Sequence, residues 1–334
     1  MRWMAIKFLC VAAALTLAGC GEQKPQQKMV AFSQANNAEP YRATQKALME
    51  KLFAQTPDVK LVASDAQQDN SKQIAQIETF IRQKPAVLIV APNERAALTA
   101  VMGRAMEAGV PVICLERDIL EPNYTTYIKM DNRAIGRLAG QFIVDQLTKK
   151  YGAPKGNVVM IRGLLGVEAE INRDGGAREI LSKYPDIHIV ADPVADWIQA
   201  QAKDRMTEVL RVQPQIDVVY GHNDPMAIGA YLAAKDLSRE KDMIFIGVDG
   251  LGGPSGGIKK VMDGVLAATF VYPLGVKEAV DVAQKIIRDP NYKPQKEITL
   301  SSTMVTPDNA KDLYEKLTVA TDQTESQTDH KAGK

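Results

Sequence analysis

Polar and charged side chains follow most of the apolar segments in this 334-residue chain, and their types favour ligand recognition over covalent chemistry. The clearest case is residues 110–118, where the apolar run Val-Ile-Cys-Leu is followed at once by Glu116, Arg117 and Asp118. Comparable groups come after other apolar runs: Ser33-Gln34 with Asn36-Asn37, Asp65, Asn93-Glu94, Gly163 to Arg173, Asp196-Trp197, His222-Asn223-Asp224, Asp249-Gly250 and Tyr272-Pro273. Such groups suit a ligand with many hydroxyls, because each polar group left unpaired on burial costs about 1–3 kcal/mol.

One segment raises the alternative of a serine hydrolase. Gly253-Pro254-Ser255-Gly256-Gly257 matches the G-x-S-x-G pattern of a nucleophile elbow. Such an enzyme needs a histidine after the serine, and the one histidine that follows Ser255 is His330, in a polar tail. The glycines therefore predict a flexible turn. The sequence also has no Walker motif, no G-x-G-x-x-G and no His/Cys metal spacing, so we expect neither an enzyme nor a bound cofactor or metal.

Predicted strands and helices alternate through the chain from residue 29 onward. Continuous apolar runs predict strands at 29–33, 59–64, 86–91, 110–115, 158–162, 188–190, 218–220, 244–248 and 266–271. Helical spacing of apolar residues predicts helices at 41–55, 71–83, 95–108, 134–149, 176–183, 200–212, 225–235 and 276–288. We expect Asp69 and Asp131 to cap helix N-termini, and Gly109 and Gly152 to end helices.

This order predicts an α/β fold with parallel sheets joined by right-handed crossovers. The strands are too many for one small sheet, so we predict two doubly wound, Rossmann-like lobes. The N-terminal lobe would comprise residues 29–130 plus 273–302, and the C-terminal lobe residues 131–272 plus 303–317. Ligands of open α/β sheets bind beyond the carboxyl ends of the strands, so the polar groups should face one cleft between the lobes.

Both ends of the chain lie outside the predicted lobes. Residues 1–20 combine positive charge, an apolar run and the sequence Leu17-Ala18-Gly19-Cys20, which resembles a lipobox. We predict a lipoprotein signal peptide with lipidation of Cys20, the alternative being an ordinary signal peptide cut nearby. We predict that residues 21–28 form a short tether and that the polar residues 318–334 form a disordered tail. The expected location is the periplasm, with a membrane anchor made by lipid alone.

The composition is that of an ordinary soluble globular protein, with 46% hydrophobic and 24% charged residues. The formal net charge is +1 and no block of Lys or Arg stands out, so nothing predicts binding to nucleic acid. Cys114 is the one cysteine outside residues 1–20, and it lies within an apolar run. We therefore expect no intramolecular disulfide, no cysteine-based metal site and a buried thiol.

Several short motifs, taken together, make the chain resemble a known protein family. They are FSQANN, LERD, MDN, NRDGG, ADW, HNDPMAIGAY, IGVDG and DGVLAATFVYP, spread over residues 29–306. With these motifs the sequence resembles the type I periplasmic sugar-binding proteins of ABC transporters, the group that includes ribose- and galactofuranose-binding proteins. The resemblance implies two hinged lobes with a sugar or polyol held between them.

The resemblance also implies which residues hold the ligand. Positions that match the family's ligand contacts are Ser33, Asn37, Tyr41, Arg42, Glu116, Arg117, Arg173, Trp197, Asn223, Asp249 and Tyr272. Further candidates are Glu39, Glu168, Asn172 and His222. In the family pattern Glu116 and Arg117 hold ring hydroxyls, and Trp197 is an aromatic platform. The alternatives are that Arg117 and Arg173 form salt bridges at the surface or hinge, that Trp197 packs in a core, and that Asp224 caps a helix.

Three positions depart from the ribose-binding pattern. Glu116 replaces an aspartate, Val248 stands where a phenylalanine is usual, and Ala91 stands where an asparagine is usual. We therefore expect a monosaccharide other than ribose, or a cyclic polyol, although two arginines could also accommodate an anionic furanosyl ligand. No EF-hand-like loop is present in the sequence, so we expect no structural calcium.

The resemblance implies a monomeric solute-binding lipoprotein that delivers a sugar or polyol to the permease of an ABC transporter. Three chain crossings, near Asp131, Tyr272 and Thr303, would form the hinge. The alternative is a receptor that passes its ligand-bound state to a sensor histidine kinase or chemoreceptor, and the sequence does not separate the two. Sugar-responsive repressors share the two-lobed fold, but they carry a helix-turn-helix where this chain has its signal sequence, so DNA binding is not expected.

Overall fold

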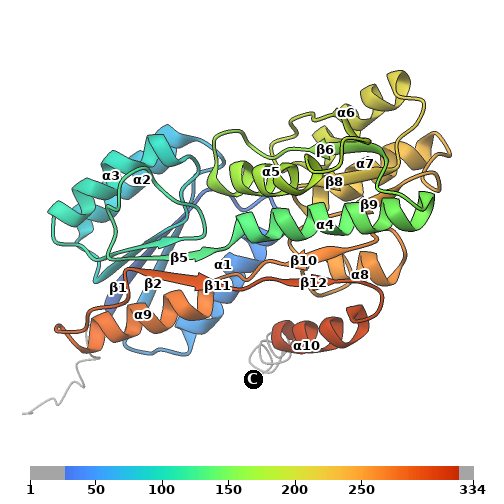
Figure 1. The fold of residues 1–334 in the computed structure, drawn as a ribbon. Helices are drawn as coiled ribbons and strands as arrows, with labels where there is room; N and C mark the ends of the chain where they lie inside the picture. The colour runs from blue at the N-terminus through green and yellow to red at the C-terminus, as the bar shows by residue number, and fades with distance from the viewer. Residues whose placement is uncertain (1–26, 323–334) are drawn as a thin grey trace, which may run out of the picture.

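Two parallel β-sheets form the centres of two lobes within residues 27–322, the part of the chain that the computed structural model describes (Figure 1). The first sheet contains β1 (Lys28–Gln34), β2 (Val59–Asp65), β3 (Val87–Val90), β4 (Val112–Leu115), β5 (Thr126–Met130) and β11 (Glu297–Leu300). Its strand order is β11-β5-β4-β3-β1-β2, and every neighbouring pair is parallel. We call this sheet and its helices the N-terminal lobe.

The second sheet contains β6 (Gly156–Ile161), β7 (Ile187–Ala191), β8 (Val218–Gly221) and β9 (Ile244–Ile246). Its order is β7-β6-β8-β9, and its pairs are also parallel. The antiparallel pair β10 (Thr269–Val271) and β12 (Thr303–Val305) lies beside it, connected through a bridge between Ile246 and Ala268. We call this part, with its helices, the C-terminal lobe. The α/β fold with two doubly wound lobes that the alternation predicts is thus confirmed.

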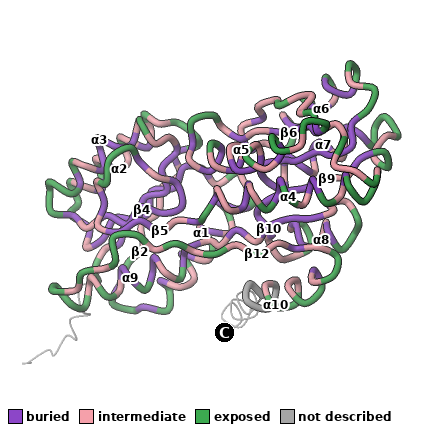
Figure 2. The backbone as a smooth tube through the Cα atoms, viewed as in Figure 1, coloured by how far each residue is buried: buried purple, intermediate pink, exposed green. Residues whose placement is uncertain are grey.

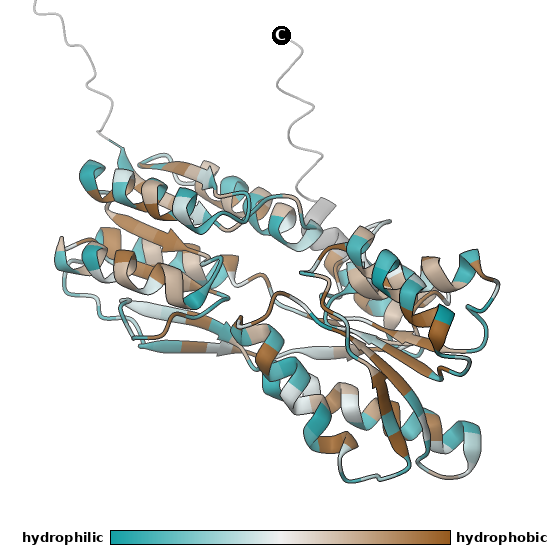
Figure 3. Cartoon of the chain, turned by 90° about the horizontal axis from the view of Figure 1, so that it is seen from above, coloured by the Kyte–Doolittle hydropathy of each residue, from teal (hydrophilic) through white to brown (hydrophobic). Residues whose placement is uncertain are grey.

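Helices cover both faces of the N-terminal sheet, which explains why its strands are continuous apolar runs. They are α1 (Pro40–Ala54), α2 (Asn70–Gln83), α3 (Arg95–Glu107) and α9 (Val276–Arg288). Val30 and Phe32 of β1 pack with Met49 of α1, whereas Ala31 between them packs with Ile77 of α2. Successive side chains of a strand point to opposite faces, so one strand contributes to two cores. Figures 2 and 3 show the result, with buried, hydrophobic strands lying between helices whose outer faces are more polar and exposed.

The C-terminal lobe is covered by α4 (Asn132–Tyr151), α5 (Glu168–Leu181), α6 (Gln199–Val212), α7 (Asp224–Asp236), α8 (Gly257–Met262) and α10 (Ala310–Asp322). Helices α4 and α5 approach each other closely because glycines lie at their contact. A Cβ atom on Gly136 of α4 would lie 2.4 Å from the carbonyl oxygen of Arg173, and one on Gly176 of α5 would lie 2.4 Å from that of Arg133. The pair therefore forms a tightly packed frame next to the cleft.

The predicted helix ends are largely correct. Asp69 and Asp131 accept hydrogen bonds from the amides of Lys72 and Ala134, each at 2.9 Å, and so cap α2 and α4 as expected. Gly152 ends α4 in a left-handed conformation with φ 70°. At α7 the prediction for Asp224 is wrong, because Asn223 is the cap.

Other boundaries differ from the prediction for physical reasons. Strands β5, β11 and β12 lack a continuous apolar run, and β11 is an edge strand with alternating exposure, so the apolar pattern missed them. Helix α5 begins at Glu168, not at residue 176, because its two central glycines serve close helix packing and do not interrupt the helix. The short α8 was not predicted, and neither was α10, which continues to Asp322, past residue 317 where we expected the folded part to end.

The chain passes between the lobes three times, in the segments where the hinge was expected. It leaves the first sheet after β5, returns after β10 towards α9, and crosses again between β11 and β12 (Figure 1). The predicted signal peptide, the lipidation at Cys20, most of the tether and residues 323–334 of the predicted tail lie outside the described residues. Within residues 27–322 no helix has both the length and the apolar character needed to cross a membrane.

Candidate ligand-binding cleft

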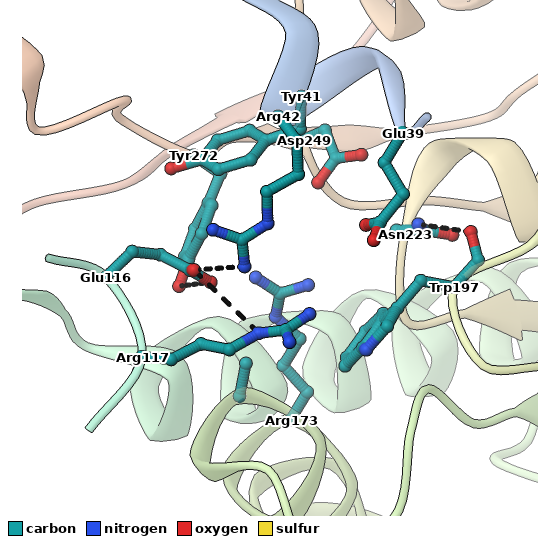
Figure 4. Close-up of a pocket in the computed structure, with 11 residues that line it drawn as sticks. Glu39, Tyr41, Arg42, Glu116, Arg117, Arg173, Trp197, Asn223, Asp249 and Tyr272 are labelled. Atoms are coloured by element: carbon teal, nitrogen blue, oxygen red, sulfur yellow. Dashed lines mark hydrogen bonds and ion pairs between the residues drawn. The ribbon is translucent and has the colours of Figure 1, made fainter. Parts of the chain in front are cut away.

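A narrow cavity lies between the two lobes, next to the carboxyl ends of their strands. It is lined by Glu39, Tyr41, Arg42, Glu116, Arg117, Ala169, Arg173, Trp197, Asn223, Asp249 and Tyr272 (Figure 4). The first five belong to the N-terminal lobe, at the start of α1 and after β4, and the others to the C-terminal lobe and the crossing after β10. The structure thus brings together most of the residues that the family resemblance implied.

The cavity residues at strand ends have unusual backbone conformations. The φ angle is 69° at Glu116, 71° at Trp197 and 138° at Asp249, all within the range that L side chains rarely adopt. Such conformations cost about 1–3 kcal/mol each and persist where the surrounding structure holds them. Their concentration around one cavity is typical of a functional site.

A buried ion pair organises the N-terminal side of the cavity. Arg42 Nη2 donates to Glu116 Oε2 at 2.5 Å, and the two side chains are only 2% and 5% exposed. Arg117 Nη1 donates to the carbonyl oxygen of Asn93 at 2.8 Å, while its Nε lies 3.9 Å from Glu116 Oε2, as an ion pair, and has no hydrogen-bond partner within the described part of the chain (Figure 4). Because Arg42 and Tyr272 both contact Glu116, this carboxylate is partly occupied by protein groups. Arg117 keeps donor capacity for a ligand.

Arg173 lies on α5, and its guanidinium extends from the C-terminal lobe towards the arginines of the other lobe (Figure 4). Its Nε donates to Asn132 Oδ1 at 3.0 Å and its Nη1 to the carbonyl oxygen of His222 at 2.5 Å. The guanidinium carbon also lies 4.4 Å from the ring centroid of Tyr272. Two of its nitrogens are thus held from behind, which fixes the direction of the rest of the fork.

Trp197 is both buried and available to a ligand. Its ring centroid lies 5.9 Å from the guanidinium carbon of Arg117 and 5.7 Å from that of Arg173, so it borders both arginines. Its Nε1 has no hydrogen-bond partner among the described residues. Asn223 fixes the backbone of this segment by donating from Nδ2 to the carbonyl oxygen of Trp197 at 3.1 Å. A C–H face of a sugar ring could pack on such an aromatic surface.

Two buried carboxyl groups, Asp224 and Asp249, lie on the C-terminal side of the cavity and influence each other. Burial, together with the charge of Asp224, raises the pKa of the Asp249 carboxyl well above its usual value. Burial likewise raises the pKa of Asp224, to about 6. Asp224 accepts hydrogen bonds from the Gly250 amide at 2.8 Å and from Thr269 Oγ1 at 2.6 Å, so it holds the segment that carries Asp249. Asp249 itself lines the cavity, where it can accept hydrogen bonds from ligand hydroxyls.

Five of the sequence candidates do not line the cavity: Ser33, Asn37, Glu168, Asn172 and His222. Ser33 is fully buried and its hydroxyl accepts from Gln73 Nε2 at 3.3 Å. His222 is also fully buried, behind Arg173, and burial plus nearby arginines lower the pKa of its imidazole well below the usual value. It contributes its carbonyl oxygen to Arg173.

Glu168 and Asn172 hydrogen-bond to each other at 2.6 Å, outside the cavity lining. Asn37 is half-buried near the start of α1. Ser255, the basis of the hydrolase alternative, is exposed in the turn before α8 and is not part of the cavity.

Several residues that shape the site were not singled out from the sequence. Ala169 lines the cavity, and Gly163 leaves room for Trp197, because a Cβ atom on Gly163 would lie 2.2 Å from the indole ring. Asn132 was identified only as part of a helix start, yet it contacts Arg173. Gly163 begins the polar segment 163–173 noted above and Asn132 belongs to the motif MDN, but which side chain each would meet depends on packing between distant segments.

Comparison with known proteins agrees with this arrangement of two lobes around one cavity. A model of the periplasmic binding protein domain matches residues 30–289. The chain belongs to the periplasmic binding protein family. Its relatives are ribose-, galactofuranose- and xylitol-binding proteins, so within the family it is a type I sugar-binding protein, and the fold is the type I periplasmic binding protein fold.

The similarity to individual members extends over most of this periplasmic binding protein. It is 30% identical over 249 residues to a xylitol-binding protein of Mycolicibacterium smegmatis, covering 72% of this chain and 69% of that protein. It is 29% identical over 319 residues to the galactofuranose-binding protein of Escherichia coli, covering 93% and 98%. Among solved structures, the fructose-binding periplasmic domain of a hybrid two-component system matches with a TM-score of 0.82 and 33% identity, over 91% of this chain and all of that one.

Proposed function

We propose that this protein is a monomeric, periplasmic solute-binding protein that captures one monosaccharide or polyol between its lobes and delivers it to the permease of an ABC transporter. The observation that carries the proposal is the composition of the cavity between the lobes. Arg117 from one lobe and Arg173, Trp197 and Asp249 from the other line the same space, so a hydroxyl-rich ligand can contact both lobes at once. Such contacts shift an open–closed equilibrium towards the closed form.

The close lining of the cavity supports a small ligand. Arg42, Arg117, Arg173 and Trp197 border it, and each is less than 5% exposed, so the lobes already lie close together around this space. The relatives named for xylitol and galactofuranose, and the structure named for fructose, are consistent with a small ligand. An oligosaccharide would not fit without opening the lobes.

The charges in the cavity support an uncharged ligand. Three arginines face three carboxyl groups: Arg42, Arg117 and Arg173 against Glu39, Glu116 and Asp249, so hydroxyls, which both donate and accept, can pair with both sets. A sugar phosphate or sugar acid would instead bring a further charge beside the buried Arg42–Glu116 pair, which is costly. Neutral pentoses, hexoses, linear polyols and cyclitols are therefore the expected class.

A thermal-shift screen followed by calorimetry tests the proposal. The panel should contain neutral pentoses, hexoses, polyols and cyclitols beside matched sugar acids and sugar phosphates. We expect a neutral compound to raise the melting temperature and to bind with micromolar affinity, about −8 kcal/mol. If only the acids or phosphates bind, the uncharged class is wrong. If nothing on the panel binds, the sugar-binding proposal itself is contradicted.

Arg173→Ala is the sharpest substitution for this proposal. We expect it to weaken binding of the compound found in the screen by about 2–5 kcal/mol, because it leaves buried partners unpaired. Arg133→Ala is a matched control, since Arg133 is 42% exposed and pairs with Glu179 outside the cavity. Equal affinities of wild type and Arg173→Ala in calorimetry would remove Arg173 from the site.

A second candidate is a sensor, favoured by the similarity to the periplasmic domain of a hybrid two-component system. In that case the closed form would be read by a histidine kinase or chemoreceptor. The two roles can be distinguished by reconstituting the protein with the membrane proteins that are encoded next to it in its genome. Stimulation of transporter ATPase activity by the ligand-loaded protein supports delivery, whereas stimulation of kinase autophosphorylation alone supports sensing.

We further propose that Cys20 is the lipidated N-terminus and anchors the protein to a membrane. The support is the sequence Leu17-Ala18-Gly19-Cys20 after an apolar run. Intact-mass measurement of the membrane fraction should show an acylated chain that starts at Cys20, and Cys20→Ser should move the protein to the soluble fraction. A soluble wild-type protein with an unmodified N-terminus would contradict the anchor.

A further inference from the structure

A continuous line of hydrogen bonds runs through Asn132 and joins the two lobes beside the cavity. Asn132 is the first residue of α4, directly after one of the three chain crossings, and only 1% of it is exposed. Its Oδ1 accepts from Arg173 Nε at 3.0 Å, and its Nδ2 donates to the hydroxyl of Tyr272 at 3.2 Å. That hydroxyl donates in turn to Glu116 Oε1 at 3.4 Å, in the other lobe.

We propose that Asn132 is a positioning residue that couples the pose of Arg173 to closure of the lobes. Its amide is suited to this task because one end accepts and the other donates. The acceptor holds Arg173, which faces the ligand in the function proposed above. The donor holds Tyr272, whose single proton is then directed to Glu116 across the cleft. Arg173 and the contact between the lobes thus depend on one side chain.

The surroundings of Asn132 leave it little freedom. A second hydrogen bond from Nδ2 to Glu168 Oε2, at 2.7 Å, fixes the amide from α5. The glycine contact between α4 and α5 brings the backbones of the two helices together at Arg173, so the helices cannot separate to accommodate another rotamer. The carbonyl of His222 holds Nη1 of the same guanidinium. Loss of the Asn132 amide should therefore free the Nε end of Arg173 and the hydroxyl of Tyr272 together, while Nη1 keeps its partner.

The emission of Trp197 provides a readout on the free protein. Trp197 is 4% exposed at the cavity, and the other tryptophan of the sequence, Trp3, belongs to the predicted signal peptide, which a mature chain starting at Cys20 lacks. Acrylamide quenches a buried indole poorly and an exposed one well, so the quenching constant under native conditions reports opening of the cleft. A Trp197→Phe protein supplies the background emission for subtraction. A residue that only stabilised the fold would change the melting temperature without changing this constant.

We expect Asn132→Ala to raise the ratio of the open to the closed form roughly five-fold, as loss of one net hydrogen bond would do, and to raise the quenching constant of Trp197 accordingly. Tyr272→Phe, which removes only the shared hydroxyl, should have a similar effect, and the double variant should add little to either. Asn172→Ala is the matched control, because Asn172 also donates to Glu168 but does not line the cavity. Its quenching constant should equal that of the wild type.

Two results would overturn the inference: unchanged quenching in Asn132→Ala, or an equal rise in Asn172→Ala. If Asn132→Ala does not fold, Tyr272→Phe decides alone, since it leaves the side-chain packing in place. The measurement needs no ligand. It can therefore fail while a sugar still binds, or succeed while every compound of the screen fails, which keeps this inference distinct from the proposed function.

Discussion

Asp249 combines two local costs, a rarely adopted backbone conformation and a buried carboxylate. With φ at 138° its backbone would suit glycine better, and it is only 6% exposed. Neither feature stabilises the fold. Both are explained if the carboxylate is needed in the cavity, because stability is commonly sacrificed where binding needs a strained or charged group.

We expect Asp249→Asn to stabilise the protein and to weaken ligand binding. The pKa of Asp249 is raised in the folded state, so the folded protein keeps a proton that the unfolded chain releases near pH 4. The stability linked to that proton is present below about pH 4 and is lost as the pH rises through the raised folded pKa. The variant avoids this loss. The difference in the free energy of unfolding between Asp249→Asn and the wild type should therefore grow with pH, to about 1–3 kcal/mol at pH 7.

Urea unfolding of both proteins between pH 4 and pH 8, with calorimetry of the ligand, checks this prediction. Asp224 is present in both proteins, so its own raised pKa, of about 6, affects both curves. Parallel stability curves would mean that Asp249 is not held in its neutral form by the fold. Undiminished ligand affinity in Asp249→Asn would mean that the carboxylate does not serve the ligand.

At the scale of elements, the position of Trp197 depends on segments far away in the sequence. Gly163 follows β6 and leaves room for the indole, and Asn223 caps α7 while it holds the Trp197 carbonyl. The loop that carries Trp197 is therefore shaped by the ends of two neighbouring strands. Its aromatic surface is only as well placed as these two contacts allow.

We expect Gly163→Ala to displace the indole and weaken binding about 3- to 10-fold, because an aromatic contact contributes about 0.5–1.5 kcal/mol. Overpacking should also lower the free energy of unfolding by about 1–3 kcal/mol. Gly103→Ala on α3 is the control, since its new methyl would meet only the flexible side chain of Asn123, at 3.1 Å. A red-shifted Trp197 emission together with weaker calorimetric binding would agree with displacement, whereas unchanged values of both would contradict it.

Apolar runs and helical spacing of apolar residues were sufficient to predict most strands and helices. Strands such as β3 and β4 are buried on both faces and therefore appear in the sequence as continuous apolar runs. Strand β11 has a polar, half-exposed sequence and is defined by pairing with β5, so no local pattern marks it. The strand-end rule likewise located Glu116, Arg117 and Asp249. It could not show that Ser33 turns towards Gln73, or that Asn132 meets Arg173, since these contacts are set by packing between helices and sheets.

At the scale of the whole molecule, each lobe is built from separate stretches of chain. The N-terminal lobe takes α9 and β11 from the far end of the sequence. Val276 and Ala279 of α9 complete a core that contains Ile113, Leu115 and Ile128. We therefore expect a chain that ends at Tyr272 to lose cooperative unfolding in both lobes, because the first sheet would expose one apolar face and β10 of the second lobe would lose its partner β12.

A chain that ends at Asp322 is the control for this truncation, since it keeps every helix and strand named above. It should unfold in one sharp thermal transition, measured by circular dichroism, and so should the full chain. The shorter chain should show a broad transition and bind a dye for exposed apolar surface. A sharp transition in the shorter chain would mean that the N-terminal lobe is stable without α9.

The late contribution of α9 also has a consequence for synthesis. While a ribosome adds residues one by one, the first 130 can form five strands and three helices, but Leu115 and Ile128 lack their cover until nearly 280 residues have been joined. The core of the N-terminal lobe thus remains incomplete until α9 has been synthesised. The segment from α9 to α10 then supplies the missing parts of both lobes, so the two lobes are completed in quick succession.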